Sequence, residues 1–335
     1  MRFGLARRQK GGNAMMFTGI YAKAITDYIE FKRSMGYKMR DVEYVFLQFD
    51  RMTVEMGIDK IGLTKELSDA WCCRKPNESQ GTQYIRAKYI SLFSRYLNGL
   101  GYDSYIPNVP KLRYSFSAYV FTKDEIIALF NACDKYAELH LKRSRYHFIP
   151  TLIRLLYCTG MRLQEALSIR KSDLDLNDLT ITVRSTKNGD DRIIPFSYSL
   201  LPYLKELMLQ HVEPKTDILF QLDYKYNTSK SWIGFHFRAI LDVAGIVYKG
   251  KQIGPRIHDL RHTFACHSLK KMDESGMDIY TGLPILSAYL GHKSMDGTEK
   301  YTKLTSEIYP DIIKKAEDLR SDLYPTLNMN DYETN

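Results

Sequence analysis

Apolar side chains recur every three or four residues through the first hundred positions, the spacing that places them on one face of a helix. The pattern predicts four helices, over about 17–36, over about 41–56, from Thr64 onward and over about 82–97. No convincing strand interrupts them, so residues 17–100 are expected to form a compact helical domain. The side chains expected to face inward are Ile20, Ala24, Tyr28 and Phe31, then Val45, Phe49 and Met52, then Leu67 and Trp71, and finally Ile85, Tyr89, Leu92, Phe93 and Tyr96.

The periodicity stops over residues 101–118. Pro107 and Pro110 lie here, followed by the basic pair Lys111 and Arg113. Such a segment is typical of a linker between two domains. Its basic and aromatic side chains would also suit a segment that follows a nucleic-acid backbone, and the pattern favours neither interpretation.

From residue 119 the pattern mixes helices with a hairpin. Thr122 and Glu125 have the spacing of a capping box before an apolar helix. An apolar helix follows over about 149–158, and another begins after Gly160. Alternating side chains over 178–183 and 192–196, with the turn pair Asn188-Gly189 between them, predict two antiparallel strands. Further helices are expected over 198–210 and 232–244, which gives an α+β class that is mostly helical.

Both ends of the chain differ from the middle. Residues 1–16 are basic and without apolar period, and are expected to be a flexible arm. An apolar stripe over 306–323 predicts a last helix, which would close a second domain at 119–325, with 326–335 as a tail. The side chains of that stripe are Ile308, Ile312, Ala316, Leu319 and Leu323.

The formal charge of +9 is unevenly distributed. Residues 1–118 hold 19 Lys and Arg against 11 Asp and Glu, while 119–335 hold 29 against 28. From residue 304 the balance reverses, with 3 basic and 7 acidic side chains. A basic first part fits a polyanionic partner, although a merely soluble surface would explain the charge equally well.

Composition narrows the cellular setting. The sequence has no run of 18 apolar residues, so no membrane span or membrane partner is expected, and the basic start lacks the apolar core of a secretory signal. The 5 cysteines are odd in number and lack metal-ligand spacing, which indicates reduced thiols in a cytoplasmic protein. Neither a P-loop nor an acidic metal cluster is present in the sequence, so no cofactor and no metal are expected.

A polar constellation lies in the second half of the chain. His258 and Arg261 stand three apart, so on a helix they share a face. Gly291 offers a helix end just before His292, and Tyr301 follows nine residues later. Each of these residues alone is usually a packing or surface residue. Their joint order is what indicates a site.

A cationic site upstream complements this constellation. Arg162 follows the break at Gly160, where a helix begins and free backbone N–H groups can help an arginine to hold an anion. Glu165, one turn further on, can hold that arginine or cap the helix. Lys187 directly precedes the Asn188-Gly189 turn and so stands at the tip of the predicted hairpin.

In this order the residues resemble the tyrosine recombinase, or phage integrase, family. The resemblance rests on T-G-M-R-L-Q-E-A-L at 159–167, H-D-L-R-H-T-F-A at 258–265, L-G-H at 290–292 and Tyr301, and it extends over about residues 17–323. It implies a helical core-binding domain of the SAM-like type and a mixed α/β catalytic domain with a small antiparallel sheet. The polar stretch 270–281 is longer than the family pattern suggests.

The resemblance also implies a reaction, in which a phosphodiester of DNA is cut and rejoined through a 3′-phosphotyrosyl bond. Two arginines would bind the phosphate and the phenol would attack it. His258 is the expected base, His292 a hydrogen-bond donor to the phosphate, and Lys187 the acid for the leaving 5′-hydroxyl. The expected catalytic set is Arg162, Lys187, His258, Arg261, His292 and Tyr301, with Glu165 in support.

Double-stranded DNA is the partner that the resemblance implies. It further implies a homotetramer on DNA with exchange of the last helix between protomers, accessory or directionality proteins, and a mobile element as the substrate of integration, excision or transposition. The apolar stripe over 306–323 fits a helix folded back on its own domain equally well. The protein would then lie in the cytoplasm with the nucleoid. Contacts to DNA outside the catalytic site are expected from Arg86, Lys88, Arg95, Lys111 and Arg113.

Two alternatives share much of this pattern. A type IB topoisomerase uses a similar catalytic core, and strand exchange against plasmid relaxation separates the two activities. A non-catalytic DNA-binding relative would act as an accessory protein and would form no covalent adduct with DNA. The intact set of six polar groups argues against the second alternative.

Overall fold

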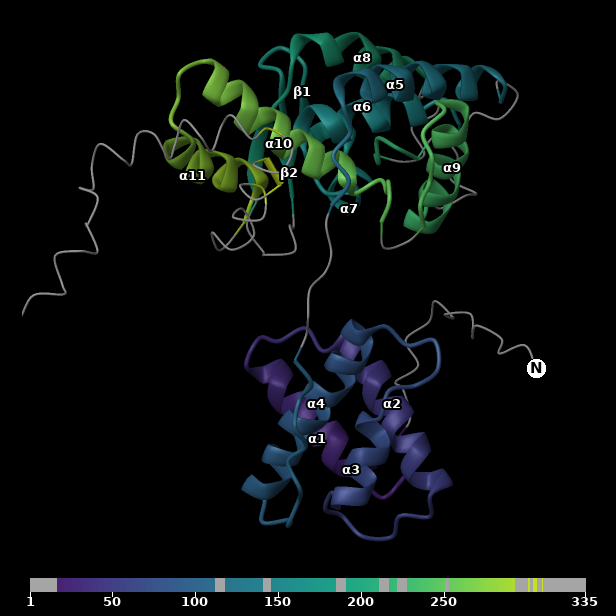
Figure 1. Ribbon diagram of the computed structural model, residues 1–335, viewed down its shortest axis with the longest axis vertical. Coiled ribbons are helices and arrows are strands. Elements are labelled where there is room, and N and C mark those ends of the chain that lie inside the picture. The colour runs from purple at the N-terminus through teal and green to yellow at the C-terminus, as the bar shows by residue number, and fades with distance from the viewer. Residues whose placement is uncertain are drawn as a thin grey trace, which may run out of the picture. The chain divides into compact units, whose positions relative to one another are not determined.

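Two compact units make up the chain, Met1–Ser115 and Phe116–Asn335 (Figure 1). The computed structural model describes residues 17–111, 118–140, 146–184, 191–210, 217–221, 228–250, 253–292, 301, 304–305 and 309. Over these residues the chain is mostly helical, with one small antiparallel sheet, so the predicted fold class is confirmed. No helix in this part of the chain is long and apolar enough to span a bilayer.

Over residues 17–111, which the structure describes, the first unit contains four helices, one for each that the apolar pattern predicted. Thr64 and Ser79 cap the third and fourth, because each hydroxyl accepts a hydrogen bond from a backbone N–H in the first turn. Gly36 and Gly57 follow the first two helices with positive φ, the conformation that ends a helix with least strain in glycine. The helices are α1 (Ala22–Ser34), α2 (Arg40–Glu55), α3 (Lys65–Cys72) and α4 (Gln80–Gly99).

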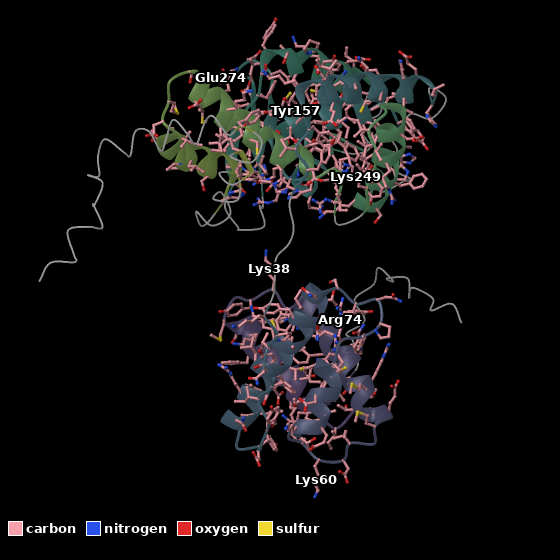
Figure 2. The ribbon with its side chains drawn as sticks, in the orientation of Figure 1. Lys38, Lys60, Arg74, Tyr157, Lys249 and Glu274 are labelled. Atoms are coloured by element: carbon pink, nitrogen blue, oxygen red, sulfur yellow. The ribbon has the colours of Figure 1, made fainter. Side chains whose placement is uncertain are left out.

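Aromatic rings form the core of the first unit. Phe46 lies between Tyr28 and Phe93, with ring centroids at 5.7 and 5.2 Å, and Phe49 packs against Trp71 at 5.3 Å. Edge-on contacts of this kind add to the free energy gained from burying the rings. Lys38, Lys60 and Arg74 extend outward from the same unit (Figure 2).

The predicted inward stripes are partly wrong. Ile20 and Phe31 are exposed, and so are Ile85 and Leu92. The expected Ala24, Tyr28 and Phe93 are buried, and the same helices, α1 and α4, also bury Ile25, Ile29, Ile90 and Leu97. Each helix carries apolar residues on more than one side, so periodicity alone does not fix which side faces the neighbouring helices.

Arg86, an expected DNA contact, lies inside the first unit. Its Nε and Nη2 each lie 2.7 Å from an oxygen of Glu78, Nη2 also donates to the Cys73 carbonyl, and Nη1 donates to the Trp71 carbonyl. The side chain is only 3% exposed. The prediction for this residue is therefore wrong: an arginine on α4 was assumed to face solvent, whereas a carboxylate and two carbonyls hold it in the interior.

The second unit is built around α6 (Ile149–Thr159). Nine of its 11 residues are buried, because α5 and α10 both pack against it. Tyr157, labelled in Figure 2, joins α6 to α10 through a hydrogen bond of 3.0 Å with Nδ1 of His267. The other helices are α5 (Lys123–Glu138), α7 (Leu163–Ala166), α8 (Leu201–Gln210), α9 (Lys230–Val243), α10 (Asp259–Glu274) and α11 (Ile279–Leu290).

The sheet is a three-stranded antiparallel ribbon. Its strands are β1 (Leu174–Asp175), β2 (Thr180–Val183) and β3 (Arg192–Pro195), in that order. Val183 pairs with Arg192, so the predicted hairpin of β2 and β3 is confirmed, whereas the short β1 was not predicted. The turn that contains Lys187 lies outside the described residues, as does the helix expected over 306–323.

The buried Arg86–Glu78 pair gives a test of the first unit's stability. Glu78→Ala leaves the guanidinium buried without its carboxylate and should lower the free energy of unfolding by about 3 kcal/mol, measured by urea denaturation. Asp27→Ala removes an exposed pair with Lys23 and should leave the urea midpoint unchanged. Equal effects of the two substitutions would contradict the buried ion pair.

Candidate active site

The guanidinium of Arg261 joins three segments of the second unit. The side chain projects from the first turn of α10 and is 3% exposed. Nη1 donates to the carbonyl of Gly160 at 2.7 Å, and Nη2 donates to the carbonyl of Leu290 at 2.9 Å. Nη2 also lies 2.8 Å from Nε2 of His292. One buried cation thus fixes the ends of α6 and α11 relative to α10.

Both carbonyls belong to helix ends capped by glycine. Gly160 and Gly291 have φ of 59° and 69°, a conformation that residues with a Cβ rarely adopt. A Cβ on Gly160 would lie 2.3 Å from Cδ1 of Phe264, so α10 also requires glycine there. The carboxyl ends of two helices, each with partial negative charge, therefore point at Arg261. Neither end carries a full negative charge, so the site keeps its positive charge for an anion.

Glu165 receives two arginines at once. Its carboxylate accepts Nη1 of Arg162 at 2.8 Å and the backbone N–H of Arg162 at 2.9 Å. Arg192, on β3, donates Nη2 at 2.8 Å and Nη1 at 3.3 Å to the same group. Burial raises the pKa of Glu165, but the hydrogen bonds from Arg192 and Arg162 outweigh it and hold the pKa at about 2.

His292 is neutral in this arrangement. Burial, followed by the charges of Arg261, Arg162 and Arg192, lowers the pKa of the imidazole to about 4. Because a guanidinium N–H can only donate, Nε2 accepts from Arg261, and the proton of the neutral ring lies on Nδ1. Any hydrogen bond that His292 gives to a phosphate in this state must come from Nδ1.

Tyr301 is buried among these groups, with 2% of its surface exposed. Its ring stacks on His292 at 6.0 Å between centroids and packs against His262 at 5.5 Å. Burial raises the pKa of the phenol above its ordinary value, while the charge and hydrogen bond of Arg261 offset part of that rise. The phenol oxygen is thus held beside the guanidinium that would also bind a phosphate.

His258 stands at the N-cap position of α10, where its side chain makes no capping hydrogen bond, and it is partly enclosed by its neighbours while part of its surface stays exposed. Loss of surrounding water lowers its pKa, and the positive charge of Arg261 lowers it further, which favours the neutral form that a base requires. Its ring lies 4.9 Å from that of His262, which in turn contacts Tyr301. Asp259 is fully buried and binds Arg256 in two places, which fixes the turn that presents His258.

Six of the expected site residues come together here: Arg162, Glu165, His258, Arg261, His292 and Tyr301. Lys187 and Arg113 lie outside the described residues, so the structure says nothing of their positions. Lys88, Arg95 and Lys111 are exposed in the first unit, as a contact with DNA requires, whereas Arg86 is buried.

Sequence reasoning missed three groups that shape the site. The carbonyls of Gly160 and Leu290 leave no signal in the residue pattern, because every residue has a carbonyl. Arg192 could have been noticed in the sequence, because it is a charged residue at the start of the return strand of the hairpin predicted around Lys187. The alternating pattern identifies it only as the first residue of the return strand.

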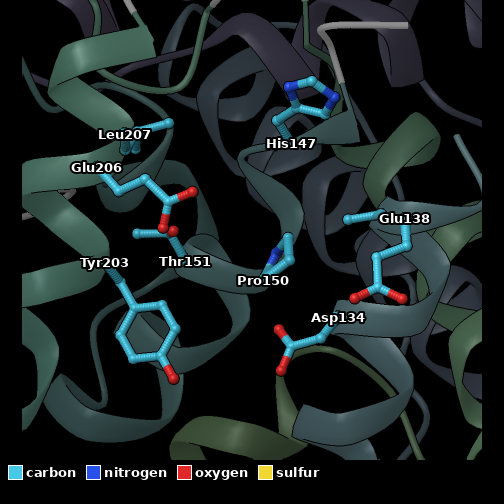
Figure 3. A pocket seen from close by; sticks show the side chains of 9 residues that line it. Asp134, Glu138, His147, Pro150, Thr151, Tyr203, Glu206 and Leu207 are labelled. Atoms are coloured by element: carbon cyan, nitrogen blue, oxygen red, sulfur yellow. The ribbon is translucent and has the colours of Figure 1, made fainter. Parts of the chain in front are cut away.

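The cavity in Figure 3 belongs to a different part of the second unit. It has a volume of about 250 Å³ and lies between α5, α6 and α8. Figure 3 shows the carboxylates of Asp134, Glu138 and Glu206 around it, and these would repel a phosphate. It shares no lining residue with the cluster around Arg261.

Comparisons with known proteins show the family of the chain. Residues 119–307 match the model of the phage integrase family. A putative integrase/recombinase, y4rB, of Sinorhizobium fredii is 28% identical over 310 residues, which cover 89% of this chain and 97% of the relative. Tyrosine recombinase XerA of Saccharolobus solfataricus is 34% identical over 64% of this chain and 62% of its own.

Solved structures show the same fold. XerH recombinase bound to a palindromic difH substrate has a TM-score of 0.58 at 20% identity, covering 83% of this chain and 77% of that one. A lambda integrase dimer bound to a core site has a TM-score of 0.57 at 15% identity, covering 83% of this chain and 94% of that one.

The low pKa of His292 predicts how stability depends on pH. Between pH 6.5 and about 4 the imidazole is protonated in the unfolded chain but neutral in the folded one. The contribution of His292 to the free energy of unfolding is therefore fully present above pH 6.5 and is lost as pH falls towards 4. His292→Gln should therefore reduce the loss of unfolding free energy between these pH values by about 1–2 kcal/mol, because the ring is partly exposed and solvent screens the rest. Urea denaturation at each pH measures this, and identical pH slopes in both proteins would contradict the low pKa.

Proposed function

The chain belongs to the phage integrase family, the tyrosine recombinases, and from that premise we propose how its own residues cut and rejoin DNA. Tyr301 attacks a phosphodiester of double-stranded DNA, forms a 3′-phosphotyrosyl bond and releases a 5′-hydroxyl. The reverse attack by a 5′-hydroxyl of another strand rejoins the DNA. The phosphotyrosyl bond keeps the energy of the broken bond, so rejoining requires no nucleotide.

One observation supports the choice of Tyr301. Its phenol is buried beside Arg261, His262 and His292. Arg261 and His262 belong to α10, whereas His292 follows the end of α11. A hydrogen bond from arginine would also satisfy a structural tyrosine, so the choice rests on the whole set of groups gathered at this hydroxyl. In a nucleophile the same arginine stabilises the phenolate and binds the phosphate that it attacks.

The charges around Tyr301 suit a phosphate. Among the residues of this cluster that the structure describes, Arg162, Arg192 and Arg261 bring three positive charges, against one negative charge on Glu165. The resulting excess of two lies in a largely buried region, where it acts more strongly than in water. Charge that develops on the non-bridging oxygens during attack is stabilised by N–H groups already in position, with little rearrangement.

Proton transfers complete the proposed reaction. We assign His258 as the base that takes the phenol proton, since its pKa is lowered and it remains exposed. Lys187 is assigned as the acid that protonates the leaving 5′-oxygen. His292 would donate Nδ1–H to the phosphate while Nε2 stays on Arg261. Each role is an assignment that single substitutions can test.

The proposed partners follow from the family. A lambda integrase tetramer bound to a Holliday junction resembles this chain with a TM-score of 0.58 at 17% identity. We propose that this chain likewise acts as a tetramer on DNA, with help from accessory or directionality proteins, on a mobile element in the cytoplasm. Exposed Lys88, Arg95 and Lys111 would contact the DNA backbone from the first unit.

Tyr301→Phe removes only the attacking oxygen, so it should abolish covalent capture of DNA and leave the dissociation constant for DNA within about threefold. The measurement uses nicked duplexes with a randomised core, which trap the adduct because the released strand diffuses away. Denaturing gels detect the adduct, and sequencing of the captured strands identifies the site. Capture of DNA by the Phe variant would contradict the assignment.

Tyr289→Phe is the matched control. This hydroxyl donates to the carbonyl of Pro195 at 3.1 Å, and burial raises its pKa to about 12, so it is a structural group. The variant should capture DNA at a rate close to that of the unaltered chain. Absence of any adduct with the unaltered chain would instead favour a non-catalytic DNA-binding protein. Relaxation of plasmids without strand exchange would favour a topoisomerase.

Removal of residues 310–335 should separate DNA binding from assembly. Leu304 and Thr305 are buried in the second unit, and Lys270 lies over the ring of Tyr309 at 4.2 Å, so a cut after Tyr309 spares the core. The truncated chain should bind a single half-site but form no tetramer on DNA, as gel filtration with multi-angle scattering would show. If the segment folds back on its own unit, the melting temperature of the free monomer should fall instead. A truncated chain that is fully stable and still tetrameric would contradict both outcomes.

A further inference from the structure

Arg192 is the arginine of this cluster to which the catalytic scheme assigns a charge but no contact with the phosphate. It stands at the start of β3 and its side chain is 14% exposed. Its guanidinium faces Glu165 with two N–H groups, Nη2 at 2.8 Å and Nη1 at 3.3 Å. Arg162 gives the same carboxylate one guanidinium N–H, at 2.8 Å. Arg192 therefore interacts more strongly with Glu165 than the side chain of Arg162 does. Its hydrogen bonds also lower the pKa of Glu165 more than those of the Arg162 side chain.

This division of bonds matters for Arg162. A guanidinium and a carboxylate that meet alone form a pair of parallel hydrogen bonds, with their charges neutralised. Arg162 makes only half of such a pair and is 25% exposed, so N–H groups remain for another anion. Arg192 instead makes two bonds to the same carboxylate, one to each oxygen. The carboxylate can thus orient Arg162 without taking its whole charge.

Arg192 also lies against the segment that carries His292. A Cβ on Gly291 would stand 3.1 Å from its Nη1 and 3.2 Å from its Cζ, so the guanidinium packs directly on this glycine. Its charge contributes to the lowered pKa of His292. This one side chain therefore joins three parts of the site. They are the helix start with Arg162 and Glu165, strand β3, and the end of α11.

We infer that Arg192 is a positioning residue for the cleavage reaction, which holds Glu165 so that Arg162 keeps N–H groups for the phosphate. The inference rests on the proposed function. Without Arg192, Glu165 would draw Arg162 into a full two-bond pair and away from the DNA. The loss should then depend on the negative charge of Glu165, which separates this role from a simple contribution to folding.

A double-substitution cycle tests this dependence. The rate of adduct formation at saturating nicked duplex should fall about 10²-fold in Arg192→Ala, with little change in the dissociation constant for DNA. Arg192→Ala combined with Glu165→Gln should recover at least about tenfold of that loss, because the neutral amide no longer captures Arg162. Arg192→Lys keeps the charge and should lie between Arg192→Ala and the unaltered chain.

Arg184→Ala is the matched control. This arginine belongs to the same hairpin but pairs with Asp173, at 2.5 Å, and should leave the adduct rate unchanged. Melting temperatures verify that each variant is folded, and Arg192→Gln replaces Arg192→Ala if the latter is not. An adduct rate within about threefold of the unaltered chain in the Arg192 variant would overturn the inference, as would a double variant no faster than the single one. If the unaltered chain forms no adduct, the proposed function itself fails.

Discussion

The buried guanidinium of Arg261 is the interaction on which the catalytic unit depends. Burying a charge costs free energy unless polar groups compensate it. Here the compensation comes from the carbonyls of Gly160 and Leu290 and from the imidazole of His292. The ends of α6 and α11 must therefore meet at α10 for Arg261 to be satisfied. The same contact brings Tyr301 and His292 beside it. Folding of the unit and assembly of the site are one event.

Two ways of burying an arginine occur in this chain, and they serve different ends. Arg86 is paired with Glu78 and two carbonyls, so its charge is neutralised inside the first unit, which it helps to stabilise. Arg261 is surrounded by groups that carry only partial charge, and Arg162 shares Glu165 with Arg192. The first arrangement leaves no net charge, whereas the second leaves an excess that a phosphate can use. The two arrangements thus differ in the number of carboxylates within reach of the guanidinium, more than in burial.

The sheet contributes position more than stability. It has three short strands, and its last one places Arg192 against Glu165 at one end while the turn before it holds Lys187. The link from β3 to Glu165 thus joins the strand that follows Lys187 in the sequence to the helix start that carries Arg162.

Local sequence determined most of the elements of this protein. The capping box at Thr122 and Glu125, the glycine ends at Gly36 and Gly160, and the β2–β3 hairpin all depend on residues a few positions apart, so their signals are visible in the sequence. The order and spacing of the polar residues likewise indicated the family, and six of the expected site residues do come together. Their individual roles stay predictions.

Tertiary structure alone decided what those residues touch. Arg86 was expected at the surface and is buried, because whether a face of α4 meets solvent depends on how the neighbouring helices pack. Arg261 reaches a carbonyl 101 positions away, and Arg192 reaches a carboxylate 27 positions away. Such contacts leave no periodic trace in the sequence, since a backbone carbonyl has no identity and an arginine at a strand start resembles any surface charge. Sequence therefore determined which groups the site contains, and packing determined which charges remain available to a phosphate.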